Sequence, residues 1–216
     1  EPTAPDLKEL QFLAENAPEA VDQAKEGISR ITTIVKSMKN FAYKDAESEK
    51  KPSDLNQAIQ STIVVATNEW KYHAELKLEL DENLPFVPCN IGEINQVVLN
   101  LVVNGAHAIR DRFQESQKGD LKVSTKHYAD ADCVVVSIID NGGGIPPKVQ
   151  ARIFEPFFTT LPDRVGLGLT IVKRILNENQ SKMEVNSSDK GTSVLLHFPV
   201  ARVSIDFNEI KERMAR

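Results

Sequence analysis

The feature that most constrains the fold is a run of three glycines directly after a strongly apolar segment. Residues 132–139 (DCVVVSII) have the composition of a buried β-strand and lead into Asp140-Asn141-Gly142-Gly143-Gly144-Ile145-Pro146. Glycine allows a positive φ and a close approach of the backbone to a ligand. Asp-Asn-Gly also builds tight turns, but three consecutive glycines followed by Ile-Pro exceed what a turn needs. The pattern predicts a strand whose carboxyl end borders a binding loop.

Strands that pair as hairpins alternate with helices through residues 54–200. Helices are expected over residues 55–70, 91–113, 147–153 and 166–178. Strands are expected over residues 76–80, 86–88, 121–128, 132–139, 181–187 and 192–198. The predicted fold class is therefore α+β: a two-layer α/β sandwich with a mixed sheet and helices on one face, preceded by a long coiled-coil-type helix.

The first 45 residues have a different pattern. Residues 6–15 predict a short helix, and Pro18 suits the first turn of a second one. Apolar residues then recur at spacings of three and four: Val21, Ala24, Ile28, Ile31, Val35, Met38 and Ala42. One interpretation is an amphipathic helix packed on its own domain. We favour a bundle helix that needs partners, which predicts a homodimer through residues 18–44.

A polar segment marks the boundary between two regions of the chain. Residues 46–53 are polar, contain a proline and lack an apolar period, so they predict a linker between a helical region (1–45) and a domain (54–200). Residues 201–216 form a C-terminal tail in which Phe207, Ile210 and Met214 have helical spacing.

Composition excludes several classes of protein. A net charge of −5 argues against a broad nucleic-acid surface. No apolar run reaches the roughly 18 residues of a membrane span, so membrane attachment is expected only through parts of a parent protein outside this chain. Cys89 and Cys133 are too few for a disulfide framework or a cysteine metal cluster, which fits a reducing, cytoplasmic location.

Three polar side chains have chemistry suited to a ligand. Asn100 and Asn104 are four residues apart and share one helix face. Their amides offer oxygen to a hard cation and N–H groups to phosphate. Asp140 can only accept hydrogen bonds when it is ionised, so it can accept from the N6 amine of adenine and would repel the O6 acceptor of guanine.

Two further segments complete a set of four short motifs, called islands here: residues 100–104, 140–146, 154–160 and 166–169. Phe154, Phe157 and Phe158 precede Thr159-Thr160 and predict a loop with apolar anchors that closes over a ligand or a partner. Gly166 and Gly168 open a helix whose free N–H groups suit phosphate. Taken singly, these islands also fit exposed asparagines, a tight turn, a hydrophobic cluster under a loop and an ordinary helix start. Their order and spacing are the specific signal.

In this order the islands resemble the N, G1, F and G2 boxes of the Bergerat-fold (GHKL) ATP-binding domain, and most closely the catalytic domain of sensor histidine kinases, over about residues 54–200. Residues 18–45 and Lys51–Gln60 resemble the second dimerisation helix and its junction, so residues 1–45 would be a partial dimerisation region. The resemblance implies that Asn104 is the Mg²⁺ ligand, that Asn100 contacts the nucleotide–metal site and that Asp140 reads the adenine amine. The other residues that it implies for the ATP or ADP site are Gly142, Gly144, Ile145, Arg164, Gly166, Gly168, Leu169 and Thr192.

Position 100 separates two chemistries within this superfamily. Its ATP hydrolases, gyrase and MutL, carry a glutamate where this chain has Asn100, and a neutral amide is a poor general base for activating water. The resemblance therefore implies phosphoryl transfer to a histidine, then relay to an aspartate on a response-regulator receiver domain. In that interpretation the chain is the catalytic fragment of a two-component sensor histidine kinase.

The chain departs from the family pattern in two places. The four histidines are His73, His107, His127 and His197, and none is followed by an acidic residue or lies in the N-terminal helix. We therefore expect the recipient histidine to lie outside this chain and the fragment to be unable to autophosphorylate. The segment from Thr160 to Leu169 is shorter than the family's lid and lacks its lysine, for which Arg164 is the candidate replacement. The alternative is a catalytically impaired nucleotide-binding or protein-interaction module of the same fold.

Overall fold

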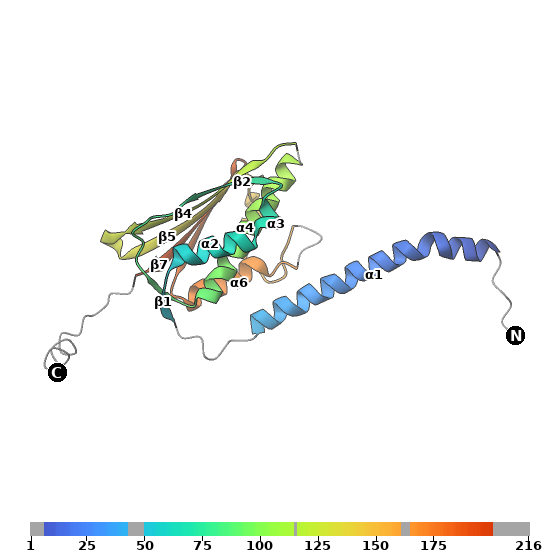
Figure 1. The fold of residues 1–216 in the computed structure, drawn as a ribbon, viewed down its shortest axis with the longest axis horizontal. Helices are drawn as coiled ribbons and strands as arrows, with labels where there is room; N and C mark the ends of the chain where they lie inside the picture. The colour runs from blue at the N-terminus through green and yellow to red at the C-terminus, as the bar shows by residue number, and fades with distance from the viewer. Residues whose placement is uncertain (1–6, 43–49, 115, 161–164, 201–216) are drawn as a thin grey trace.

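Five strands form the central sheet of the protein (Figure 1). The structure, a computed structural model, describes residues 7–42, 50–114, 116–160 and 165–200. The strands are β2 (Ala74–Glu79), β4 (Gly119–Tyr128), β5 (Cys133–Asp140), β7 (Gly191–Pro199) and β6 (Lys182–Ser188), in that spatial order. β2 runs parallel to β4 and the other neighbours are antiparallel, so the predicted mixed sheet is confirmed.

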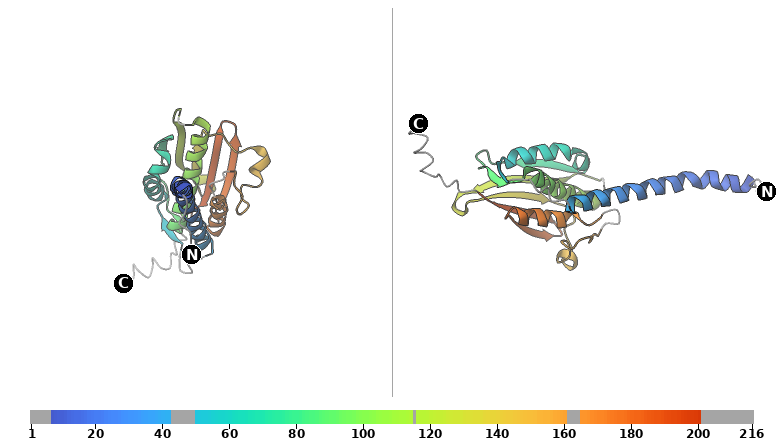
Figure 2. Two further views of the ribbon diagram at one scale, coloured as in Figure 1. Left: turned by 90° about the vertical axis from the view of Figure 1, so that its right-hand side faces the viewer. Right: turned by 90° about the horizontal axis from the view of Figure 1, so that it is seen from below.

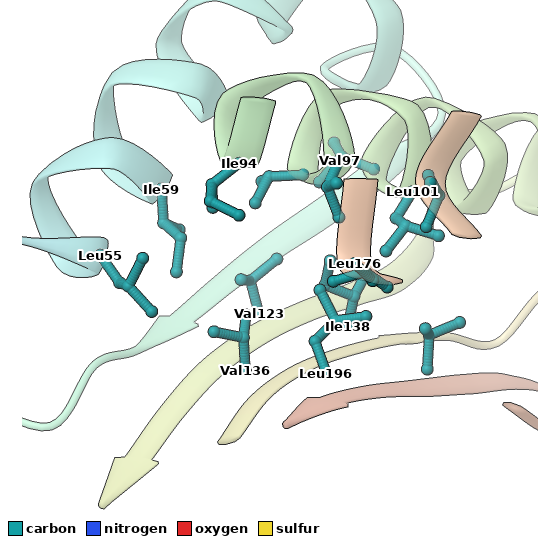
Figure 3. Close-up of a cluster of buried hydrophobic side chains, with 14 of the residues drawn as sticks. Leu55, Ile59, Ile94, Val97, Leu101, Val123, Val136, Ile138, Leu176 and Leu196 are labelled. Carbon is teal, nitrogen blue, oxygen red and sulfur yellow. The ribbon is translucent and has the colours of Figure 1, made fainter. Parts of the chain in front are cut away.

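Helices α2 (Leu55–Val65), α3 (Thr67–Trp70), α4 (Ile91–Phe113) and α6 (Gly168–Glu178) lie on one face of this sheet, and the short helix α5 (Pro147–Gln150) lies in the segment between β5 and α6. Alternate residues of the strands point toward α2, α4 and α6 and form one hydrophobic core with them (Figure 3). Its labelled members include Ile59, Ile94 and Leu176 from the helices and Val123, Val136 and Leu196 from the strands. The two-layer sandwich is therefore confirmed.

Side-chain hydrogen bonds fix where the main helices begin and how two of them meet. Asp54 caps α2 by accepting from the backbone N–H of Gln57 (3.0 Å), and Asn90 caps α4 by accepting from the backbone N–H of Gly92 (3.1 Å). The buried side chain of Asn179, just past α6, donates to the Glu93 carboxylate (2.9 Å) and accepts from the Asn90 backbone N–H (3.4 Å). The end of α6 is thereby attached to the start of α4.

Two local predictions are wrong. The helix expected over residues 55–70 divides at Ala66 into α2 and α3, because the Thr67 hydroxyl donates to the carbonyl oxygen of Val64 (2.7 Å) and competes with the helical hydrogen bonds. Residues 51–53, expected as linker, form β1 (Lys51–Ser53), which pairs antiparallel with β3 (Val87–Cys89). A charged segment of this length shows no apolar pattern that would identify it as a strand.

The N-terminal segment is one helix, α1 (Leu7–Ala42), and not the two that Pro18 predicts (Figure 2). A proline removes one backbone donor, but neighbouring turns can still form, and the Asn16 side chain donates to the carbonyl oxygen of Phe12 (2.8 Å) just before it. Val21, Ile28 and Ile31 are all more than half exposed. The side chains of Val35, Met38 and Ala42, and the tail 201–216, lie outside the described residues. Within the described ranges, none of the helices combines the length and apolarity of a membrane span.

The core predicts a large difference between two isoleucines. Ile109 on α4 is fully buried, whereas Ile139 on β5 is 38% exposed. Ile109→Ala is expected to lower the free energy of unfolding by about 2–5 kcal/mol, because it leaves a cavity between α4 and the sheet. Ile139→Ala, the matched control, is expected to cost less than about 1 kcal/mol. Urea unfolding measures both, and equal losses would contradict this packing.

Candidate functional site

A row of residues on α4 faces a cavity of about 680 Å³. Asn100, Asn104, Ala108 and Arg112 follow one another at intervals of four, so they form a stripe along one side of the helix. The rest of the wall comes from further residues of α4, the glycine loop after β5, α5 and the segment after it, the phenylalanine segment and the start of α6. These wall residues include Gly143, Gly144, Ile145, Pro146, Phe158, Thr159, Thr160, Val165, Gly166, Leu167, Gly168 and Leu169.

The structure brings most of the predicted site residues to this cavity. Its lining contains seven of them: Asn100, Asn104, Gly144, Ile145, Gly166, Gly168 and Leu169. Asp140, Gly142 and Thr192 do not line it and instead form a connected group next to it. Arg164 lies outside the described residues. The predicted site is thus a cavity with an adjoining polar group, and the roles of its residues remain predictions.

Asp140 ends β5 beside α4. Its Oδ1 accepts from the backbone N–H of Gly142 (2.8 Å), and β7 places Thr192 directly opposite it. A Cβ on Gly105 would lie 3.0 Å from Leu121 Cδ1 and 3.3 Å from the Asp140 Cβ, so the absence of a side chain there lets α4 pack closely against the end of β5. Burial raises the pKa of the Asp140 carboxyl, and hydrogen bonds from the backbone of Gly142 and Thr192 act in the opposite direction.

The glycine loop lies against two neighbouring elements. A Cβ on Gly142 would lie 2.6 Å from the Cβ of Ala108 on α4, so no side chain fits there. Gly144 has a φ of +71°, and a Cβ on it would collide with the carbonyl oxygen of Ser188. The Ser187 hydroxyl accepts from the backbone N–H of Ile145 (2.8 Å) and contacts the Thr192 hydroxyl (2.9 Å). The loop is therefore held between α4 and the β6–β7 hairpin.

The start of α6 has the character of an anion site. Gly168 and Leu169 line the cavity, and no described side chain caps the first turn, which leaves its N–H groups and positive dipole end directed at the cavity. Gly166 has a φ of +72°, and a Cβ on it would lie 2.5 Å from the carbonyl oxygen of Phe158. The phenylalanine segment therefore packs directly against Gly166, two residues before α6.

The stripe on α4 also fits a phosphate-bound magnesium ion. Asn100 donates through Nδ2 to the carbonyl oxygen of Gln96 (3.0 Å), and its Oδ1 would lie 3.3 Å from a Cβ on Gly168. Among the described residues, no group of three or more His, Cys, Asp or Glu side chains could hold a metal by itself. Mg²⁺ commonly takes phosphate and water ligands with few protein groups, so one amide oxygen from this stripe matches its chemistry.

The three phenylalanines have different surroundings. Phe158 lines the cavity, and the Arg152 guanidinium lies 4.3 Å from its ring centroid. Phe154 lies under the Lys173 ammonium at 5.3 Å. Phe157 is 59% exposed and has a φ of +64°, which is unusual for a side chain of this size. Of the three, only Phe158 contributes to the cavity wall.

Sequence reasoning missed three residues of the site. Gly105 lets α4 pack closely against the strand end at Asp140, and a glycine within a predicted helix directly after Asn104 was the signal that could have identified it. Arg112 contacts the glycine loop, but an arginine in the last turn of a helix is ordinary and gives no signal. Ser187 contacts the loop from β6 and likewise has nothing local to distinguish it.

Comparison with known proteins establishes the family. Residues 90–202, more than half of the chain, match the family described as histidine kinase-, DNA gyrase B-, and HSP90-like ATPase. The chain therefore belongs to this family of ATPases, and the resemblance seen in its sequence is confirmed.

The similar proteins are sensor histidine kinases. The chain is 30% identical to sensor protein TdiS of Thauera aromatica over 77% of this chain and 30% of TdiS. It is 32% identical to signal transduction histidine-protein kinase AtoS of Escherichia coli strain K12 over 74% of this chain and 25% of AtoS. The chain thus spans less than a third of the length of these relatives. Histidine kinase ThkA, solved in complex with response regulator protein TrrA, matches with a TM-score of 0.66 and 26% identity over 87% of this chain and 52% of that chain.

The glycine loop generates a prediction with an internal control. Gly144→Ala is expected to lower the free energy of unfolding by about 1–3 kcal/mol or more. An alanine there would combine a positive φ with a collision between its Cβ and the Ser188 carbonyl oxygen. Gly143→Ala, one residue earlier, would place its Cβ in open space and is expected to leave stability unchanged. Thermal unfolding of the two variants measures the difference, and equal midpoints would contradict the described loop.

Proposed function

We propose that this chain is the ATP-binding catalytic part of a two-component sensor histidine kinase. It binds Mg²⁺–ATP in the cavity and transfers the γ-phosphoryl group to a histidine on a helix outside this chain, for relay to a receiver-domain aspartate. The observation that carries the proposal is the meeting of two neutral amides, Asn100 and Asn104, with the uncapped start of α6 around one cavity. This set suits the binding and positioning of a triphosphate.

The nucleotide has a base end and a phosphate end in this proposal. The purine lies toward Asp140, whose carboxylate accepts a hydrogen bond from the N6 amine. The phosphates extend along the α4 stripe to the N–H groups of α6. Asn104 is the residue that we expect to hold the metal, and a bound magnesium ion supplies positive charge to the phosphate oxygens.

Phosphoryl transfer needs positioning more than acid–base chemistry at this site. An unprotonated imidazole nitrogen forms the new P–N bond while the bond from the γ-phosphorus to the bridging oxygen breaks, and ADP leaves with the electron pair. The α6 N–H groups stabilise the charge on the transferred group. Asn100 is neutral and cannot remove a proton from water, which disfavours hydrolysis as the competing reaction.

The acceptor and the partners follow from the same proposal. His73, His107, His127 and His197 all lie in the domain that carries the site, and none is on α1. A separate helix therefore supplies the acceptor, and α1 supplies the homodimer interface through residues 18–44. A receiver domain is the expected partner, in line with the complex formed by ThkA.

The adenine assignment predicts the effect of one substitution. Asp140→Asn is expected to weaken ADP binding by about 1–3 kcal/mol, because it replaces a charged acceptor with an amide that can also present a donor to the N6 amine. Isothermal titration calorimetry of the two proteins measures this. An unchanged affinity would contradict the assignment.

The same substitution predicts a pH dependence. The pKa of Asp140 is raised, so its folded-state carboxylate becomes protonated at a higher pH than an ordinary aspartate. The carboxylate is fully ionised well above this pKa, so nucleotide binding that depends on its charge is strongest there. This binding weakens as the pH falls through the pKa. The affinity ratio of wild type to Asp140→Asn is expected to fall toward one on acidification, since protonation of the nucleotide affects both proteins equally. A constant ratio would contradict the role of the charge.

Transfer itself is tested by supplying the missing helix. A separate helical hairpin that carries a histidine followed by an acidic residue is expected to acquire an acid-labile, base-stable label from labelled ATP, whereas this chain alone acquires none. Asn104→Ala is expected to abolish labelling and to reduce the magnesium dependence of ATP binding. Calorimetry with and without Mg²⁺ provides the second readout. Binding without transfer would favour the catalytically impaired module, and identical magnesium titrations would contradict the role of Asn104.

A further inference from the structure

Arg112, in the last turn of α4, joins three segments through one nitrogen. Its Nη1 donates to the carbonyl oxygens of Asn141 (3.0 Å), Gly142 (2.9 Å) and Asp189 (3.1 Å). The first two belong to the glycine loop after β5, and the third belongs to the β6–β7 hairpin. Arg112 is itself exposed, so water competes for its guanidinium, and the hydrogen bond to Gly142 is the part-buried one of the three.

The loop held by Arg112 is the one that orients Asp140. Gly142 donates its N–H to Asp140 Oδ1 (2.8 Å) while its carbonyl oxygen accepts from Arg112, so both backbone polar groups of this residue are engaged. Asn141 is fixed from the other side, because its Oδ1 accepts from the backbone N–H of Asp120 (2.8 Å). Loss of Arg112 would leave the Gly142 carbonyl without this donor and free the loop to move relative to α4.

We propose that Arg112 is a positioning residue for base recognition: it holds the Gly142 peptide, and through it the Asp140 carboxylate, in the place where the purine is read. This inference rests on the proposed function, because it assumes that adenine binds at Asp140. Its consequence is selective. Without Arg112 the site loses its preference for adenine over guanine, and contacts to the phosphates remain.

Arg112 also lines the cavity, which provides a competing explanation for any loss of binding. An arginine that contacts phosphate directly would strengthen ADP and GDP binding equally, since the two share the same diphosphate. An arginine that acts only on folding would change the fraction of active protein and leave the ratio of the two affinities constant. The ratio of ADP to GDP affinity therefore separates positioning from both alternatives.

The experiment uses the whole chain and four proteins: wild type, Arg112→Ala, Arg112→Lys and Arg110→Ala. Arg110 is the matched control, because it lies on the same turn of α4 but its guanidinium pairs with its neighbour Asp111 (3.0 Å). Calorimetry gives the affinity for ADP, and competition against ADP gives that for GDP, both with magnesium. Arg112→Ala is expected to lower the ADP-to-GDP affinity ratio about tenfold, the equivalent of about 1.4 kcal/mol.

The conservative variant Arg112→Lys tests whether the guanidinium geometry matters. It also keeps the test usable if the alanine variant misfolds. Lysine keeps the positive charge but its side chain is one bond shorter, so Arg112→Lys is expected to retain part of the selectivity. Arg110→Ala is expected to match wild type. If Arg112→Ala does not fold, the ratio in Arg112→Lys carries the comparison.

The outcomes distinguish a failure of the Arg112 proposal from a failure of the proposed function. Equal weakening of ADP and GDP, or no change in either, would overturn the positioning role of Arg112 while the proposed function stands. Failure of the wild type to bind ADP would overturn the proposed function itself.

Discussion

The site depends on the contact between the backbone of Gly142 and helix α4 at Ala108. A Cβ on Gly142 would lie 2.6 Å from the Ala108 Cβ, so the loop after β5 reaches the helix only because position 142 has no side chain. This contact brings Asp140 at the strand end beside the helix that carries Asn100 and Asn104. The loop cannot move away without losing the hydrogen bond from Arg112 to the Gly142 carbonyl.

Helix α4 therefore organises both ends of the site from one stripe. Residues at intervals of four place the two amides near the start of α6, Ala108 against the glycine loop and Arg112 on its carbonyl oxygens. Because a helix is rigid over this length, the separation of the two ends is determined by its geometry and not by loop conformation. Asn179 adds a second constraint, since it attaches the end of α6 to the start of α4 and so fixes the two helices relative to each other.

What the sequence predicts well is local. The bounds of α4 follow from a long apolar period, and the β6–β7 hairpin follows from its turn residues. The helix through Pro18 and the strand β1 were missed, because surrounding turns outweigh one lost donor and a charged strand has no apolar signature. The contacts of Arg112 join residues 29, 30 and 77 positions apart, and such side-chain-to-backbone bonds have no signature in composition or spacing.

The proposed role of Asp140 would use an environment that is unfavourable to its charge. Burial opposes the charge of its carboxylate, as its raised pKa indicates, and the N–H groups of Gly142 and Thr192 offset this only in part. Burial has removed water from this carboxylate, which accepts only a few hydrogen bonds in return. A bound adenine amine would add a further donor to it. Guanine would instead place an acceptor there and leave two acceptors facing each other without a proton, so a buried acceptor penalises the wrong base more strongly than an exposed one.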